Sequence, residues 1–215
     1  MADFEYAIIV KNKTRLETLI DHFNTKAQAK FYIESKGGDF TDYEMEHEQF
    51  VQSMTSVQTQ LSSLMKHKTI DRQYVPSYLF SKKNLIIVVG QDGLVANTAK
   101  YSQGLPIIAV NPDPDRYDGI LLPFRTENFL GGVDNVLSKR HRLEIKRFAE
   151  ARLHDGQRIL AFNDLFIGVS SHISARYRIS YSGKSEEQSS SGLIVSTKAG
   201  STGWLSSLFN MAYGV

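Results

Sequence analysis

Residues 84–93 constrain the fold more than any other part of the sequence. Five apolar residues, 85–89, follow one another without a break, and four of them are β-branched. A parallel strand that is buried on both faces has this composition. Glycines follow at Gly90 and Gly93, and residues 94–102 have the pattern of a helix. A strand, a glycine turn and a helix in this order predict an α/β domain whose ligands bind beyond the carboxyl end of the strand.

The turn Gly90-Gln91-Asp92-Gly93 is a candidate phosphate site. Glycine lets a backbone approach a phosphate closely, and the start of a helix supplies free N–H groups. Asp92 adds a carboxylate among these donors. The Gly-x-Asp-Gly pattern also occurs in ordinary surface turns. At this point the residues leave both interpretations open.

Composition and charge exclude several classes of protein. The 215 residues are 41% hydrophobic and 22% charged, as in globular proteins of one large or two small domains. The net charge of +2 is too small to predict binding to nucleic acid or an anionic membrane. Cysteine is absent, which excludes disulfides and thiolate metal sites. Without a leader-like start or an apolar run of about 18 residues, we expect a cytoplasmic protein.

The rest of the first domain, residues 1–137, alternates strands and helices. Thr14 and Thr25 are predicted to cap two helices, and an apolar stripe indicates a long helix over residues 41–68. Further along we expect strands at 6–10, 105–110 and 120–122 and a helix at 126–137. The proline-containing loop after residue 110 lies at the end of a strand, so its polar residues face either the Asp92 crevice or solvent.

The pattern changes near residue 138, where short strand-like runs replace helical periodicity. We expect strands at 142–148, 159–168, 175–181 and 193–197, and a loop in the Ser-rich segment 185–191. These runs predict a second, mostly antiparallel domain over residues 138–215. Since they are too few to close a sandwich, we interpret this β-sandwich domain as incomplete.

Two further motifs carry a resemblance to a known family. Asn163-Asp164 lies within a strand-like run, and a strand leads into Lys198-Ala-Gly200-Ser201-Thr202. Following an α/β domain with a Gly-x-Asp-Gly turn, these motifs resemble those of the NAD kinases. The mitochondrial-type members are the most similar, since they share the elements Lys13-Thr-Arg15, residues 110–116, Phe166-Ile-Gly168, Ser190-Ser191-Gly192 and Trp204. The resemblance covers essentially the whole chain.

The resemblance implies an activity and a set of site residues. NAD kinases transfer a phosphoryl group from ATP or another donor, with Mg²⁺, to the 2′-hydroxyl of the adenosine ribose of NAD(H), giving NADP(H). It implies that Asp92 is catalytic, that no protein side chains form a dedicated metal site, and that the chain forms a homodimer or a larger homo-oligomer. It implies that the nucleotide and its phosphates are bound by Gly90, Gln91, Gly93, Lys198, Gly200, Ser201 and Thr202. It assigns the NAD to Asn163, Asp164, Asn111, Asp113, Arg116, Ser191 and Trp204.

The sequence departs from the family pattern at functional positions. Gln91 stands where the family has a second glycine, Leu94 where it has threonine, and Asp164 where it has glutamate. A side chain at Gln91 adds bulk against the phosphates. Two alternatives to an NAD kinase therefore remain open: a related kinase that acts on a lipid or sugar hydroxyl, and a non-catalytic nucleotide-binding protein.

Overall fold

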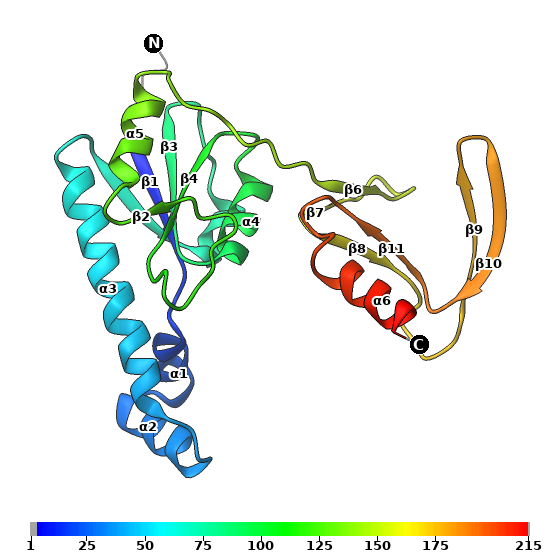
Figure 1. Ribbon diagram of the computed structural model, residues 1–215, viewed down its shortest axis with the longest axis horizontal. Helices are drawn as coiled ribbons and strands as arrows, with labels where there is room; N and C mark the ends of the chain where they lie inside the picture. Colours follow the sequence, from blue (N-terminus) through cyan, green and yellow to red (C-terminus); the bar gives the residue numbers. More distant parts are fainter. Residues whose placement is uncertain (1–3, 215) are drawn as a thin grey trace. The chain divides into compact units, whose positions relative to one another are not determined.

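The protein is mixed α/β and divides into two compact units. The computed structural model describes residues 4–214 and separates Met1–Leu143 from Glu144–Val215 (Figure 1). The sequence placed the corresponding boundary at 137/138. Each unit is described by itself below. No helix among residues 4–214 has both the length and the apolar character needed to cross a membrane.

Unit 1 is built on a five-stranded parallel sheet. Its strands lie in the order β2-β1-β3-β4-β5, and every neighbouring pair is parallel. The central strand β3 lies between β1 and β4, so it is hydrogen-bonded along both edges. The bounds are β1 Tyr6–Lys11, β2 His67–Asp71, β3 Asn84–Val89, β4 Ile107–Asn111 and β5 Phe124–Arg125.

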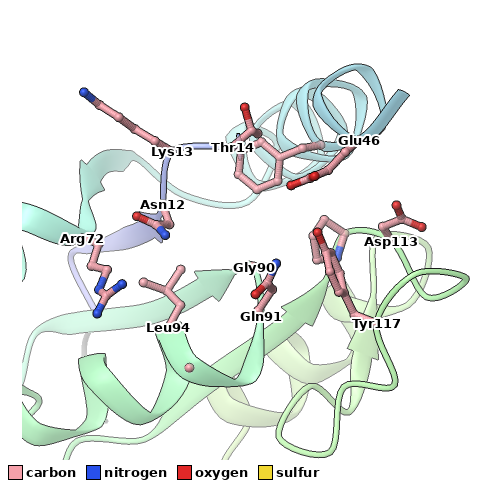
Figure 2. A pocket seen from close by; sticks show the side chains of 13 residues that line it. Asn12, Lys13, Thr14, Glu46, Arg72, Gly90, Gln91, Leu94, Asp113 and Tyr117 are labelled. Atoms are coloured by element: carbon pink, nitrogen blue, oxygen red, sulfur yellow. The ribbon is translucent and has the colours of Figure 1, made fainter. Parts of the chain in front are cut away.

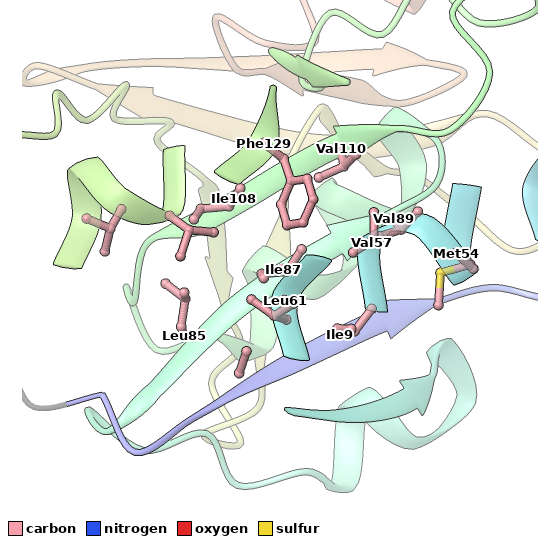
Figure 3. Packing of buried hydrophobic residues seen from close by; sticks show 13 residues of the cluster. Ile9, Met54, Val57, Leu61, Leu85, Ile87, Val89, Ile108, Val110 and Phe129 are labelled. Carbon is pink, nitrogen blue, oxygen red and sulfur yellow. The ribbon is translucent and has the colours of Figure 1, made fainter. Parts of the chain in front are cut away.

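Helices cover both faces of this sheet. On one face, α3 and α5 contribute Val57, Leu61 and Phe129 to a buried cluster with alternate residues of β1, β3 and β4 (Figure 3). On the other face, Val75 of the 3₁₀ helix η1 and Leu94 of α4 pack on the remaining strand residues. The helices are α1 Arg15–Phe23, α2 Lys26–Ser35, α3 Phe40–Ser62, η1 Arg72–Ser77, α4 Asp92–Tyr101 and α5 Phe129–Leu137.

The predicted caps of the first two helices are confirmed. The Thr14 hydroxyl accepts a hydrogen bond from the Glu17 N–H, and the Glu17 carboxylate accepts one from the Thr14 N–H. The Thr25 hydroxyl accepts the N–H of Gln28 at the start of α2. These bonds satisfy amide groups that have no partner inside a helix, and they fix where each helix begins.

Several expected boundaries in unit 1 were wrong. The long helix ends at Ser62 rather than at residue 68, and His67–Asp71 forms the edge strand β2. The polar sequence of β2 resembles a solvated helix end, so helical periodicity alone does not reveal the strand. The expected strand at 120–122 is a turn, and pairing with β4 instead occurs at Phe124–Arg125. The last helix begins at Phe129, three residues after the predicted 126.

Unit 2 consists of three antiparallel strand pairs and one helix, so its predicted antiparallel character is confirmed. The pairs are β6 with β7, β8 with β11, and β9 with β10. The elements are β6 Ala149–Arg152, β7 Arg158–Ala161, β8 Asp164–Ile167, β9 Ala175–Tyr181, β10 Lys184–Ser190, β11 Leu193–Ser196 and α6 Trp204–Tyr213.

Three expectations for this unit were wrong, and one helix was not expected. Residues 142–148 form no strand, and the run 159–168 is two strands divided at Phe162-Asn163. The Ser-rich segment expected as a loop is mostly strand β10, because the Ser182-Gly183 turn has positive φ at both residues and brings it against β9. The helix α6 was not anticipated.

We predict that Leu85→Ala lowers the free energy of unfolding of unit 1 by about 2–5 kcal/mol. Leu85 lies in β3 and is 1% exposed, so truncation leaves a cavity between α3 and the sheet. The measurement is urea unfolding followed by far-UV circular dichroism. The same substitution at Leu79, which is 84% exposed, is the control, with an expected change within about 0.5 kcal/mol. Equal effects of the two substitutions would contradict the assignment of β3 as the centre of the core.

Candidate functional site

A cavity of about 120 Å³ lies in unit 1, beyond the carboxyl ends of β1, β3 and β4 (Figure 2). Its floor is formed by Gly90, Gln91, Gly93 and Leu94, from the turn after β3 and the first turn of α4. This is the edge of the sheet at which parallel α/β proteins bind ligands. The volume is smaller than the roughly 300–1,000 Å³ of typical ligand pockets, so it accommodates a small group or one part of a larger ligand.

The two glycines of the floor differ in the space that a side chain would have at each position. At Gly90, φ is +159°, and a Cβ atom would lie 2.9 Å from the Leu94 Cδ2. A Cβ on Gly93 would meet no atom within 4 Å, so nothing in the chain itself requires a glycine there. Gln91 occupies the N-cap position of α4 but makes no capping bond with its side chain. The floor therefore presents an uncapped helix start and open space above Gly93.

Asp92, the predicted catalytic residue, is the first residue of α4 and is not among the residues that line the cavity. Its carboxylate accepts backbone N–H groups from Ile120 at 3.1 Å and from Leu121 at 2.8 Å. These two bonds join the start of α4 to the turn that follows the β4 loop. Each carboxylate oxygen retains a second lone pair for a further donor.

The loop after β4 is held in shape by Asn111, which is 4% exposed. Its side-chain oxygen accepts the Asp113 N–H at 3.0 Å, and its amide donates to the Tyr117 carbonyl at 2.8 Å. Pro112 and Asp113 line the cavity, whereas Asn111 does not. The role of Asn111 in this structure is to fold the loop.

A charged network docks this loop on α3. Arg116 contacts the carboxylates of Asp42 at 2.7 Å and Asp113 at 3.2 Å. Arg15 contacts the same Asp42 at 2.7 Å and also Glu46, which is 6% exposed. Hydrogen bonds from Arg15 and Arg116 lower the pKa of Asp42 and so keep it ionised. The network thus joins α1, α3 and the loop around one wall of the cavity, formed by Glu46 and Asp113.

Tyr117 stands on the same wall (Figure 2). Burial raises the pKa of its phenol, and the neighbouring Glu46 carboxylate raises it further, while Gln91 and Arg116 act in the opposite direction. The phenol therefore stays protonated at neutral pH. It contributes a neutral donor beside Gln91, at the end of the cavity away from Arg72 (Figure 2).

The opposite wall carries Asn12, Lys13 and Arg72 (Figure 2). The Lys13 ammonium pairs with Asp21, which raises its pKa. Within residues 4–214, no hydrogen bond or ion pair engages the Arg72 guanidinium. Sequence reasoning missed Arg72, Asn12 and Glu46 as site residues. For Arg72 the available signal was its position directly after a strand, which the overlong helix prediction concealed.

Within unit 2, the two motifs of the resemblance lie against each other. The Thr197 N–H donates to the Asn163 carbonyl at 2.8 Å, and the Thr197 hydroxyl donates to the Phe162 carbonyl at 2.6 Å. A Cβ on Gly200 would lie 2.4 Å from the Asn163 carbonyl oxygen, so only glycine permits this approach. The turn containing Gly200 is therefore fixed against the bend between β7 and β8.

Most side chains of the predicted site residues around this contact are exposed to solvent, and one buried carboxylate oxygen there lacks a hydrogen-bond partner among the described residues. The Asp164 Oδ1 is buried and has no hydrogen-bond partner among the described residues. Trp204 is 47% exposed and packs on Phe166, with ring centroids 5.9 Å apart. The Ser201 hydroxyl donates to the Lys198 carbonyl at 2.8 Å. The remaining predicted residues of this unit are exposed: Ser191, Lys198 and Thr202.

Comparison with known proteins adds no assignment. No protein-family model matches the sequence, and no curated protein matches it. Among residues 4–214, no group of three or more His, Asp or Glu side chains is arranged to hold a metal ion.

We predict that Asp42 titrates below 3.8, the ordinary value for an aspartate, and that Arg116→Gln raises its pKa toward that value. Because the folded-state pKa is depressed, the Asp42 bonds stabilise the docked loop above the ordinary pKa and are lost as pH falls through the depressed one. Carboxyl ¹³C chemical shifts followed between pH 2 and 6 measure both values. Lys82→Gln removes a charge outside the cavity and should leave the Asp42 curve unchanged. An Asp42 curve that does not respond to Arg116→Gln would contradict the network.

Proposed function

We propose that the protein is a nucleotide-dependent kinase of the NAD kinase type, which phosphorylates the 2′-hydroxyl of the adenosine ribose of NAD(H). One observation carries the proposal: the Gly90–Gly93 turn of the family-like motif forms the floor of a cavity at the ligand-binding edge of a parallel sheet. The pairing of Asn163 with the Gly200 turn adds support. A Rossmann-like unit 1, a β-sandwich unit 2 and a homodimer belong to the same proposal.

The chemistry required is phosphoryl transfer to an alcohol. The hydroxyl oxygen forms a bond to the γ-phosphorus of the donor while the bond to the β–γ bridging oxygen breaks, and the hydroxyl proton passes to a base. Asp92 is the base in this proposal, since its oxygens can accept a donor beyond the Ile120 and Leu121 amides. A Mg²⁺ ion coordinated mainly by the phosphates needs few protein ligands.

In this proposal the remaining candidate residues bind and orient the nucleotides. The uncapped start of α4 and the space above Gly93 suit a phosphate group. The buried, unpartnered Oδ1 of Asp164 suits a ribose hydroxyl, because a carboxylate oxygen without a donor is costly unless a ligand supplies one. Asn163 and Trp204 then contact the adenosine part of NAD.

A second candidate is a non-catalytic nucleotide-binding protein. Two observations favour it over other kinases: Asp92 does not line the cavity and already binds two amides, and the Gln91 side chain occupies the cavity floor. Such a protein binds NAD without converting it.

We predict that the full chain forms NADP(H) from NAD or NADH with ATP or polyphosphate and Mg²⁺. Asp92→Asn should lower kcat by about 100-fold or more, because it removes the base while preserving an acceptor oxygen. An enzymatic assay for NADP(H) measures this, and calorimetry with NAD measures binding. Binding of NAD without turnover in the wild-type protein would reject the kinase in favour of the second candidate. If the wild-type protein shows neither turnover nor NAD binding, both candidates are rejected.

We further predict that Gly93→Ala weakens nucleotide binding without lowering thermal stability. The added methyl group meets no protein atom but occupies the space that the proposal gives to a phosphate, and alanine favours the helix by up to about 1 kcal/mol over glycine. A melting curve and a calorimetric titration with NAD separate the two effects. Gly131→Ala in α5, where the Cβ also meets open space, is the matched control. Unchanged NAD affinity in Gly93→Ala would contradict the location of the phosphate.

A further inference from the structure

We propose that Arg72 binds a phosphate group of the nucleotide in the unit 1 cavity and selects for ligands that carry a pyrophosphate. The inference deepens the proposed function and rests on it, because it names a phosphate-binding residue outside every motif of the family resemblance. The observation behind it is a guanidinium on the wall of the cavity that has no partner among residues 4–214 (Figure 2).

The distribution of charge around the cavity identifies Arg72 as the anion-binding group. On the far wall, Glu46 and Asp113 are paired with Arg15 and Arg116. Those two guanidiniums also share Asp42, so that wall holds three carboxylates against two cations. It therefore repels an anion, and an anionic group is driven toward the opposite wall.

The opposite wall offers one uncommitted cation among the described residues. Lys13 is engaged by Asp21, whereas Arg72 makes no such bond. Its sequence neighbour Asp71 pairs with Lys11 at 3.2 Å. A guanidinium presents a planar set of N–H donors that matches two phosphate oxygens at once. Asn12, on the same wall, adds a neutral amide.

Packing fixes the start of η1 beside the glycine floor. Arg72 is the first residue of η1, directly after β2, and Val75 of the same turn is fully buried. Val75 belongs to the cluster that includes Leu94 and Val95 of α4. The packing of Val75 on α4 thus fixes the base of the Arg72 side chain on the cavity wall, and the residue is exposed to solvent. Because Arg72 and Gly93 both line the cavity, a ligand phosphate above Gly93 shares it with this cation and with the start of α4.

The experiment is calorimetric titration of the full chain with two probes, inorganic pyrophosphate and adenosine. The variants are Arg72→Gln, Arg72→Lys and the control Lys82→Gln, which removes an exposed charge outside the cavity. We expect Arg72→Gln to weaken pyrophosphate binding by about 10–100-fold and Arg72→Lys to weaken it less, since lysine keeps the charge but not the paired donors. Adenosine binding and the Lys82→Gln titrations should be unchanged.

The outcomes separate this inference from the proposed function. Pyrophosphate affinity that is equal in wild type and Arg72→Gln overturns the inference, as does a wild-type protein that does not bind pyrophosphate. An equal loss of adenosine affinity also overturns it, because the effect of the variant is then not specific to a phosphate group. If NADP(H) forms with kcat and KM unchanged in Arg72→Gln, the proposed function stands and the inference fails. Arg72-dependent pyrophosphate binding without NADP(H) formation supports the inference and rejects the proposed function.

Discussion

The burial of β3 on both faces is the constraint on which the rest of unit 1 depends. Residues 85–89 are at most 1% exposed, and alternate side chains belong to opposite core clusters. Neither face tolerates a polar residue, and both edges of the strand are hydrogen-bonded to neighbours. The strand therefore cannot slip by one residue without exchanging its two faces. Because its register is fixed, the position at which the chain leaves the sheet, Gly90, is fixed as well.

The parts of the fold that the sequence predicted are those in which local signals and packing agree. β3 follows from an unbroken apolar run, and the first two helices follow from threonine caps that the structure confirms. Two of the strands that escaped prediction, β2 and β10, are polar and depend on a partner strand for their conformation. The β-propensity of one segment taken alone does not include the stabilisation that its partner strand supplies.

The candidate site likewise has parts that the sequence predicted and parts that it did not. The glycine floor was predictable, because glycine, carboxylate and helix start are adjacent in the sequence. The direction of the Asp92 carboxylate was not predictable, because it is set by the amides of Ile120 and Leu121, which lie far along the chain. Arg72 was missed because it is proposed as a site residue on its place in the cavity wall and on its lack of a counter-ion among residues 4–214, which only the three-dimensional arrangement reveals. The sequence assigned Asn111 to the NAD; in the structure its side chain is hydrogen-bonded to Asp113 and Tyr117 of its own loop, which the sequence did not predict.

In unit 2, the contact between the Asn163 bend and the Gly200 turn is made almost entirely by main-chain atoms and the Thr197 hydroxyl. The side chains of Asn163 and Asp164 make no hydrogen bond to any residue between 4 and 214. The residues that hold the two segments together are consequently different from those to which the proposal gives ligand contacts. In the proposed function, replacing Asp164 by the longer glutamate changes the reach of a ligand-binding carboxylate while the main-chain contact persists, whereas any side chain at Gly200 would separate the segments. If the bend binds a ligand as proposed, single substitutions at these side chains change its preference without a compensating change in the main-chain contact.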